Sequence, residues 1–123
     1  MGGKGYEDLD IYRDSYNSAM KIHDLSLKLP TFELYEVGSQ IRRSSKSIVA
    51  NIAEGYGRRR YKNEFIRFLI YAYASCNETK VFLRFIHDSG YIKQDRFSKY
   101  LEEYNDLGRK IYNFIEIIEK RNP

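Results

Sequence analysis

The sequence contains one cysteine, two prolines and no tryptophan among its 123 residues. The single cysteine, Cys76, cannot form a disulfide within the chain, so we expect a cytoplasmic location, where thiols stay reduced. The prolines stand at positions 30 and 123, which leaves the long segment between them free to form helices. No apolar run approaches the roughly 18 residues of a membrane-spanning helix. We therefore expect no membrane partner.

Signals for β-structure and for catalysis are also missing. There is no sustained apolar–polar alternation and no Asn-Gly or Asp-Gly hairpin turn. Phosphate-binding loops, nucleophile elbows and dinucleotide fingerprints do not occur. The two histidines, His23 and His87, have no cysteine or acidic cluster near them at metal-ligand spacing. We therefore expect no cofactor, no metal and no enzymatic activity.

Helical periodicity of apolar residues occurs four times. We expect helices at about residues 8–29, 37–56, 63–88 and 94–120, the first ended by Leu29-Pro30 and the second by Gly55 and Gly57. Four long helices with short links predict an all-α, antiparallel up-down-up-down four-helix bundle. We expect one domain at residues 8–120, preceded by a flexible N-terminus at residues 1–7.

Each predicted helix has an apolar stripe that we assign to the core. In the last two helices these stripes are Phe65, Phe68, Leu69, Ala72, Cys76, Thr79, Leu83 and Ile86, and then Phe97, Leu101, Tyr104, Ile111, Ile115 and Ile118. In the second helix the stripe is Val37, Ile41, Ser45, Ile48 and Ile52. In the first helix we assign Leu9, Tyr12, Tyr16, Met20, His23 and Leu27 to the core.

The first two helices carry a second apolar stripe as well. In the first helix it consists of Ile11, Ile22, Leu25 and Leu29, and in the second of Val49, Ala50 and Ala53. A monomer would leave these stripes in water, and the twelve tyrosines add contact area of a kind that is enriched at interfaces. We therefore expect a closed homo-oligomer. The alternative is scattered apolar surface residues, which are common.

Positive charge is concentrated in one segment. The chain has a net charge of +4, whereas residues 42–62 alone hold seven basic side chains and one acidic one. The basic residues are Arg42, Arg43, Lys46, Arg58, Arg59, Arg60 and Lys62. The second helix ends and the third begins within this cluster, and helix dipoles favour cations only at the former. Guanidinium groups suit phosphates, and Tyr56 and Tyr61 beside the loop suit stacking on bases.

We therefore predict that this segment binds RNA or DNA with low sequence specificity. The alternative is a solvated basic turn.

Two carboxylates, Glu54 and Glu78, lie on the second and third predicted helices. A catalytic acid–base couple is one interpretation of the pair. We favour a structural role for both, with Arg43 within reach of Glu78 across the helix pair. Asn51 is expected to be a buried polar group that determines how the helices meet, and Gly55 to end its helix.

The stretch "SQIRRSSKSIVANIAEGYGR", followed by "EFIRFL" and "AYASCNE", resembles a family of bacterial four-helix-bundle proteins first noticed in intervening sequences of large-subunit ribosomal RNA genes. The matching positions are Gln40, Arg42, Arg43, Ser47, Ile48, Asn51, Ile52, Ala53, Glu54, Gly55 and Arg58, then Glu64, Phe65, Phe68, Leu69, Ala72, Ser75 and Glu78. Departures from the family pattern occur at Ser44, Arg60 and Ala74.

The resemblance implies a cytoplasmic bundle that assembles into a cyclic homopentamer. Related accessory proteins of diversity-generating retroelements form similar basic barrels that engage a reverse transcriptase and nucleic acid. The molecular role of the family itself is largely undefined. The resemblance therefore suggests an alternative to nucleic-acid binding: a scaffold or accessory subunit that docks an acidic protein partner, such as a polymerase or reverse transcriptase.

Overall fold

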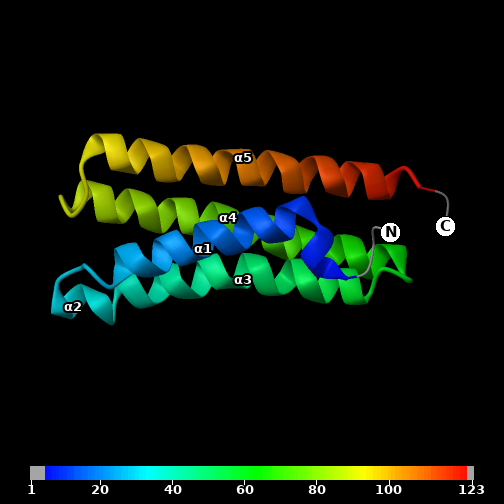
Figure 1. The fold of residues 1–123 in the computed structure, drawn as a ribbon, viewed down its shortest axis with the longest axis horizontal. Helices are drawn as coiled ribbons and strands as arrows, with labels where there is room; N and C mark the ends of the chain where they lie inside the picture. The colour runs from blue at the N-terminus through cyan, green and yellow to red at the C-terminus, as the bar shows by residue number, and fades with distance from the viewer. Residues whose placement is uncertain (1–4, 122–123) are drawn as a thin grey trace.

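The computed structural model describes residues 5–121 and shows a bundle of four long helices (Figure 1). The long helices are α1 (Asp10–Ser26), α3 (Val37–Gly57), α4 (Lys62–Asp88) and α5 (Gln94–Glu119). The short elements are the 3-10 helix η1 (Tyr6–Asp8) and the single-turn helix α2 (Thr31–Leu34). No strand occurs among the described residues. The prediction of an all-α fold with four long helices is confirmed.

The expected flexible N-terminus needs a correction. Residues 1–4 lie outside the described part of the chain, but Tyr6–Asp8 form η1, which packs against α1 and α3. The backbone N–H of Leu9 bonds to the carbonyl of Tyr6, so the chain turns directly into α1.

The four long helices run alternately up and down (Figure 1). In the contact pattern α3 lies between α1 and α4, and α5 packs mainly against α4. Helix α1 ends at Ser26, ahead of Pro30, and α2 occupies part of the connection that follows. Helix α4 ends in a turn at Gly90, whose φ of 86° is in the region that favours glycine. The N–H of Tyr91 bonds back to the carbonyl of Ile86, which satisfies an end carbonyl of α4.

The predicted core stripes of α3, α4 and α5 are confirmed with small exceptions. Val37, Phe68 and Leu101 are half-buried, whereas the other assigned residues of these helices are buried. Among the fully enclosed side chains are Ile41, Ile48, Ile52, Leu69, Leu83 and Ile111.

The predicted core face of α1 is wrong. Ile22 is fully buried, whereas Met20 is 48% exposed, and Tyr16 and Leu27 also face solvent. The buried face holds the residues assigned to the second stripe, Ile11, Ile22, Leu25 and Leu29, together with Ser15, Ser18 and Ala19. These small side chains let α1 approach its neighbours closely. Tyrosine and methionine also tolerate water better than isoleucine does, so burying the aliphatic face is favourable.

Helices α3 and α4 approach each other along a row of small polar residues. Thr79 donates a hydrogen bond of 2.9 Å to the hydroxyl of Ser44, and Ser75 donates one of 3.0 Å to the hydroxyl of Ser47. At the far end, a Cβ atom placed on Gly55 would lie 3.0 Å from Cβ of Phe68. Small residues are therefore what allows this close contact.

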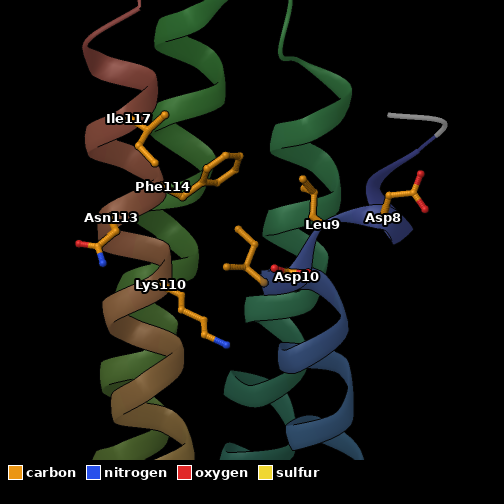
Figure 2. A pocket seen from close by; sticks show the side chains of 8 residues that line it. Asp8, Leu9, Asp10, Lys110, Asn113, Phe114 and Ile117 are labelled. Atoms are coloured by element: carbon orange, nitrogen blue, oxygen red, sulfur yellow. The ribbon is translucent and has the colours of Figure 1, made fainter. Parts of the chain in front are cut away.

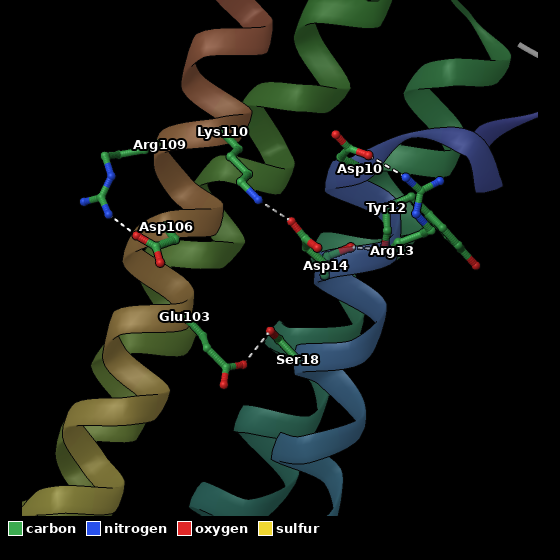
Figure 3. A network of polar contacts seen from close by, with 10 residues as sticks. Asp10, Tyr12, Arg13, Asp14, Ser18, Glu103, Asp106, Arg109 and Lys110 are labelled. Carbon is green, nitrogen blue, oxygen red and sulfur yellow. Dashed lines mark hydrogen bonds and ion pairs between the residues drawn. The ribbon is translucent and has the colours of Figure 1, made fainter. Parts of the chain in front are cut away.

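Helices α1 and α5 are bridged by polar side chains (Figure 3). Glu103 accepts hydrogen bonds from Ser18 at 3.1 Å and from Lys21 at 2.9 Å. Lys110 donates to Asp14 at 2.7 Å, and this bond raises the pKa of Lys110. The exposed ion pairs contribute little stability, so this side of the bundle is held less firmly than the α3–α4 contact.

Candidate nucleic-acid interface

The loop between α3 and α4 presents three consecutive arginines at one end of the bundle (Figure 1). Its backbone is satisfied internally, because the N–H groups of Arg58, Arg59 and Tyr61 bond to the carbonyls of Gly55, Tyr56 and Arg58. The side chains of Arg58, Arg59 and Arg60 are all exposed. The turn therefore directs three guanidinium groups toward solvent.

Each of the three arginines lies over an aromatic ring. The Cζ atom of Arg59 is 4.0 Å from the ring centroid of Tyr56, and its Nη1 also donates to the carbonyl of Tyr56. The Cζ atom of Arg60 is 5.8 Å from the centroid of Tyr61. Stacking on a ring leaves the N–H edges of a guanidinium available to a phosphate, so Arg59 and Arg60 are presented as donors.

Arg58 differs from the other two because carboxylates neutralise it. Its guanidinium lies 3.7 Å from Glu54 and 3.5 Å from Glu64, and its Cζ is 4.5 Å from the centroid of Phe68. Arg58 therefore ties the end of α3 to the start of α4. Glu54 itself is exposed at the surface of the molecule, where such a pair contributes little stability.

Two further basic residues, Lys120 and Arg121, lie near Lys62, and the sequence analysis did not include them. The Nζ of Lys62 donates to the carbonyl of Arg121 at 2.6 Å, which brings the end of α5 beside the start of α4. Lys120 and Arg121 are both exposed there. The up-down order of the helices could have identified them, because it places the end of the fourth helix beside the second connection.

The structure separates the other predicted basic residues from this end. Arg42 is engaged within the fold: its Nη1 donates to Ser26 at 2.9 Å and its Nη2 to the carbonyl of Leu34 at 2.8 Å. Arg43 and Lys46 are exposed on α3. Twelve residues separate Lys46 from Arg58, about 18 Å along a helix. The seven residues therefore do not form one continuous patch.

The expected ion pair between Arg43 and Glu78 is not formed within residues 5–121, and Glu78 is exposed without a hydrogen-bond or ion-pair partner there. The expectation that Glu78 pairs with Arg43 inside one protomer is therefore wrong. Asn51 is half-buried and donates to the carbonyl and hydroxyl of Ser47 at 2.8 and 3.0 Å. Ser75 of α4 also bonds to Ser47, so Asn51 acts on the α3–α4 contact only through Ser47 and is not itself the buried group that we expected.

The single cysteine lies in the core between α4 and α5. Cys76 is fully buried, and its Sγ donates to the carbonyl of Tyr104 at 3.2 Å. Burial raises the pKa of its thiol to about 11, which disfavours the reactive thiolate. Within the described residues no three His, Cys, Asp or Glu side chains are grouped so as to hold a metal.

The cavities are open surface grooves. One of about 480 Å³ lies between the start of α1 and the end of α5 (Figure 2). Its lining is Asp8, Leu9, Asp10, Ile11, Lys110, Asn113, Phe114 and Ile117. It combines apolar walls with charged residues at the rim. Across residues 5–121, no helix carries an apolar stretch that could cross a bilayer.

Comparisons with known proteins agree with this architecture. Residues 7–113 match the family model described as 23S rRNA-intervening sequence protein. A crystal structure from Bacteroides thetaiotaomicron, of a protein with unknown function from the S23 ribosomal protein family, superposes with a TM-score of 0.79. The two sequences are 24% identical, and the superposition covers 86% of this chain and 95% of the other, which shows a shared fold. Comparison with curated proteins found no match. The family match spans most of the chain, so this protein belongs to the family of 23S rRNA-intervening sequence proteins.

Proposed function

We propose that the protein is a non-enzymatic, cytoplasmic, ring-forming helical bundle that binds RNA or DNA through the end of the bundle where α3 meets α4. The observation that carries this proposal is the presentation of Arg59 and Arg60. Both are exposed, both lie over tyrosine rings, and neither forms an ion pair with a carboxylate within residues 5–121. Lys120 and Arg121 add positive charge at the same end.

Binding through these residues is electrostatic. Arginine donors contact phosphate oxygens, and an exposed ring such as that of Tyr61 stacks on an unpaired base. Phosphate contacts carry no sequence information, so sequence preference is weak. Affinity falls by orders of magnitude between roughly 50 and 200 mM salt, because each phosphate contact releases a counterion.

Assembly into a ring multiplies this charge. The exposed side chains of Tyr16 and Met20 on α1, beside Ala50 on α3, form an apolar surface that a monomer leaves in water. The fivefold number is taken from the family resemblance. Light scattering coupled to size exclusion at micromolar concentration tests the assembly, and a monomer peak would contradict it.

The binding test is a fluorescence-anisotropy titration of single-stranded RNA at 50 mM salt. The Arg59→Ala/Arg60→Ala variant is expected to lose at least tenfold in affinity. The matched control is Arg96→Ala/Arg109→Ala, which removes two exposed arginines from α5 and should bind like the wild type. Equal loss in both variants would indicate that only net charge matters.

A second candidate is an accessory subunit that docks an acidic protein, such as a polymerase or reverse transcriptase, on the same arginines. It is favoured by the stacking of Arg59 and Arg60 on tyrosines, since arginine over an aromatic ring is also typical of protein interfaces. Wild-type protein that does not bind RNA at 50 mM salt would favour this candidate.

A further inference from the structure

Two exposed apolar surfaces lie on α3 and α4. The first, the α1–α3 groove, has a volume of about 330 Å³ and is lined by Tyr6, Tyr12, Tyr16, Ala19, Met20, Lys46, Val49, Ala50 and Ala53. The second, the α4 stripe, consists of Ile70, Ala74, Val81 and Phe85, which helical spacing places on one side of α4. Ile70, Val81 and Phe85 are 49%, 53% and 60% exposed. These are large apolar side chains without a partner in the described chain.

The two surfaces lie on opposite sides of the face that α3 and α4 form together. The groove lies on the α1 side of α3. The stripe leans toward α5, because Val81 and Phe85 line a hollow together with Leu101 and Asn105 of α5. A single copy of the protein therefore carries one apolar surface on each flank of its α3–α4 face, and the two surfaces are different in shape.

The contacts between α3 and α4 show how far along the bundle axis each residue of these surfaces lies, which we call its height. Gly55 lies against Phe68. Ala53 precedes Gly55 by two residues and Ile70 follows Phe68 by two, so Ala53 and Ile70 are level in antiparallel helices. In a ring whose axis is parallel to the helices, neighbouring copies are related by a rotation that leaves the height of every residue unchanged. In such a ring Ile70 of one copy meets the next copy at the height of Ala53, where the small side chain leaves room.

Charges of opposite sign are level in the same way. Arg43 and Glu78 each directly precede a member of the Ser44–Thr79 hydrogen bond, so their heights differ by roughly 3 Å. Both are exposed and neither has an ion-pair partner within residues 5–121. By the same rule Arg67, which directly precedes Phe68, is nearly level with Glu54. Complementary charges therefore accompany the apolar residues at two heights.

We propose that the part of the α4 stripe that holds Ile70 and Ala74 docks into the α1–α3 groove of the next copy, with Glu78 of the first copy paired to Arg43 of that next copy. This inference rests on the ring assembly of the proposed function and names its contact surfaces. Groove and stripe are different surfaces, so the contact is heterologous and repeats around a ring. Because both surfaces adjoin the α3–α4 face, that face turns toward the ring axis. Arg43, Ser47, Asn51 and Glu54 then line the inner wall.

The test uses two double variants of the full chain. The groove variant is Ala50→Glu/Ala53→Glu, and the stripe variant is Ile70→Glu/Ala74→Glu. Neither alters a fully buried residue, so both should fold, which circular dichroism checks. Each variant alone should be monomeric by light scattering. An equimolar mixture should give a heterodimer, since one intact groove and one intact stripe remain. The control, Ile117→Glu, changes a 54% exposed isoleucine of α5 and should leave the ring intact.

The outcomes separate this inference from the assembly itself. A wild-type monomer would overturn both. If the wild type forms a ring and either variant forms one too, only the proposed contact would be overturned. A mixture of the two variants that stays monomeric would have the same meaning. A second measurement uses charge reversal: Arg43→Glu and Glu78→Arg should each shift dissociation of the ring to at least tenfold higher protein concentration, and the double variant should restore it. Failure of the double variant to do so would contradict the pairing.

Discussion

The hydroxyl of Thr79 on α4 lies 2.9 Å from the hydroxyl of Ser44 on α3, and both side chains are almost fully enclosed. The Thr79 hydroxyl shares its single proton between Ser44 and the carbonyl of Ser75, while the Ser44 hydroxyl donates to the carbonyl of Ile41. Each hydroxyl therefore contacts its own helix as well as the facing one. Small hydroxyl residues thus let α3 and α4 pack closely without leaving buried polar groups unpaired.

This relationship predicts the effect of Thr79→Val. Valine keeps the shape of threonine but leaves the Ser44 hydroxyl without its donor inside the core, which should lower the free energy of unfolding by about 1–2 kcal/mol. Urea denaturation measures the change. The control is Thr31→Val at an exposed position, where an effect within about 0.5 kcal/mol is expected. Equal effects at the two positions would show that the buried hydrogen bond is unimportant.

Gly55→Ala should destabilise the bundle although alanine is the better helix former. The added Cβ would lie 3.0 Å from Cβ of Phe68 and 3.4 Å from the carbonyl oxygen of Phe65, so the backbones of α3 and α4 would have to move apart by a few tenths of an ångström. We expect a loss of about 1–3 kcal/mol. Gly57→Ala is the matched control, since its Cβ meets no atom within 4 Å and should be neutral or stabilising by up to about 1 kcal/mol. Thermal unfolding measures both variants, and a lower melting temperature for Gly57→Ala than for Gly55→Ala would refute the prediction.

Cys76 should make stability depend on pH in the alkaline range. Burial raises the pKa of its thiol from 9.0 to about 11 in the folded state, so the thiol ionises first in the unfolded chain. The stabilising contribution is complete below pH 9 and is lost as pH rises through 11, by about 3 kcal/mol in total. Urea denaturation at several pH values should therefore show a steeper decline for the wild type than for Cys76→Ala. Parallel declines would assign the pH dependence to other groups.

Glu64→Gln should strengthen RNA binding. Glu64 lies 3.5 Å from Arg58, and removing its charge leaves that guanidinium freer to contact phosphate. We expect a severalfold gain in affinity at 50 mM salt, about 1 kcal/mol or less. Anisotropy titration measures it, with Glu102→Gln on α5 as the control for net charge, since Glu102 is exposed. A gain of the same size in the control would show that the location of the charge does not matter.

The family resemblance and the helix pattern were both readable from the chain, because each depends on residues close together in sequence. Pro30 ends the first helix, and the spacing of Ile41, Ile48 and Ile52 already identifies the core face of α3. The arginine turn was recognised for the same reason, since Arg58, Arg59 and Arg60 are consecutive. Local periodicity thus determined the number, order and approximate limits of the long helices.

Tertiary structure alone decided which face of α1 is buried, because both faces are apolar and periodicity does not rank them. The choice depends on how well Ile22 rather than Met20 fits against the other helices. Packing likewise engages Arg42 with Ser26 and brings Arg121 beside Lys62. It also leaves Arg43 and Glu78 unpaired within a protomer. These outcomes rest on contacts between residues far apart in the chain, and such contacts form only when the helices have packed together.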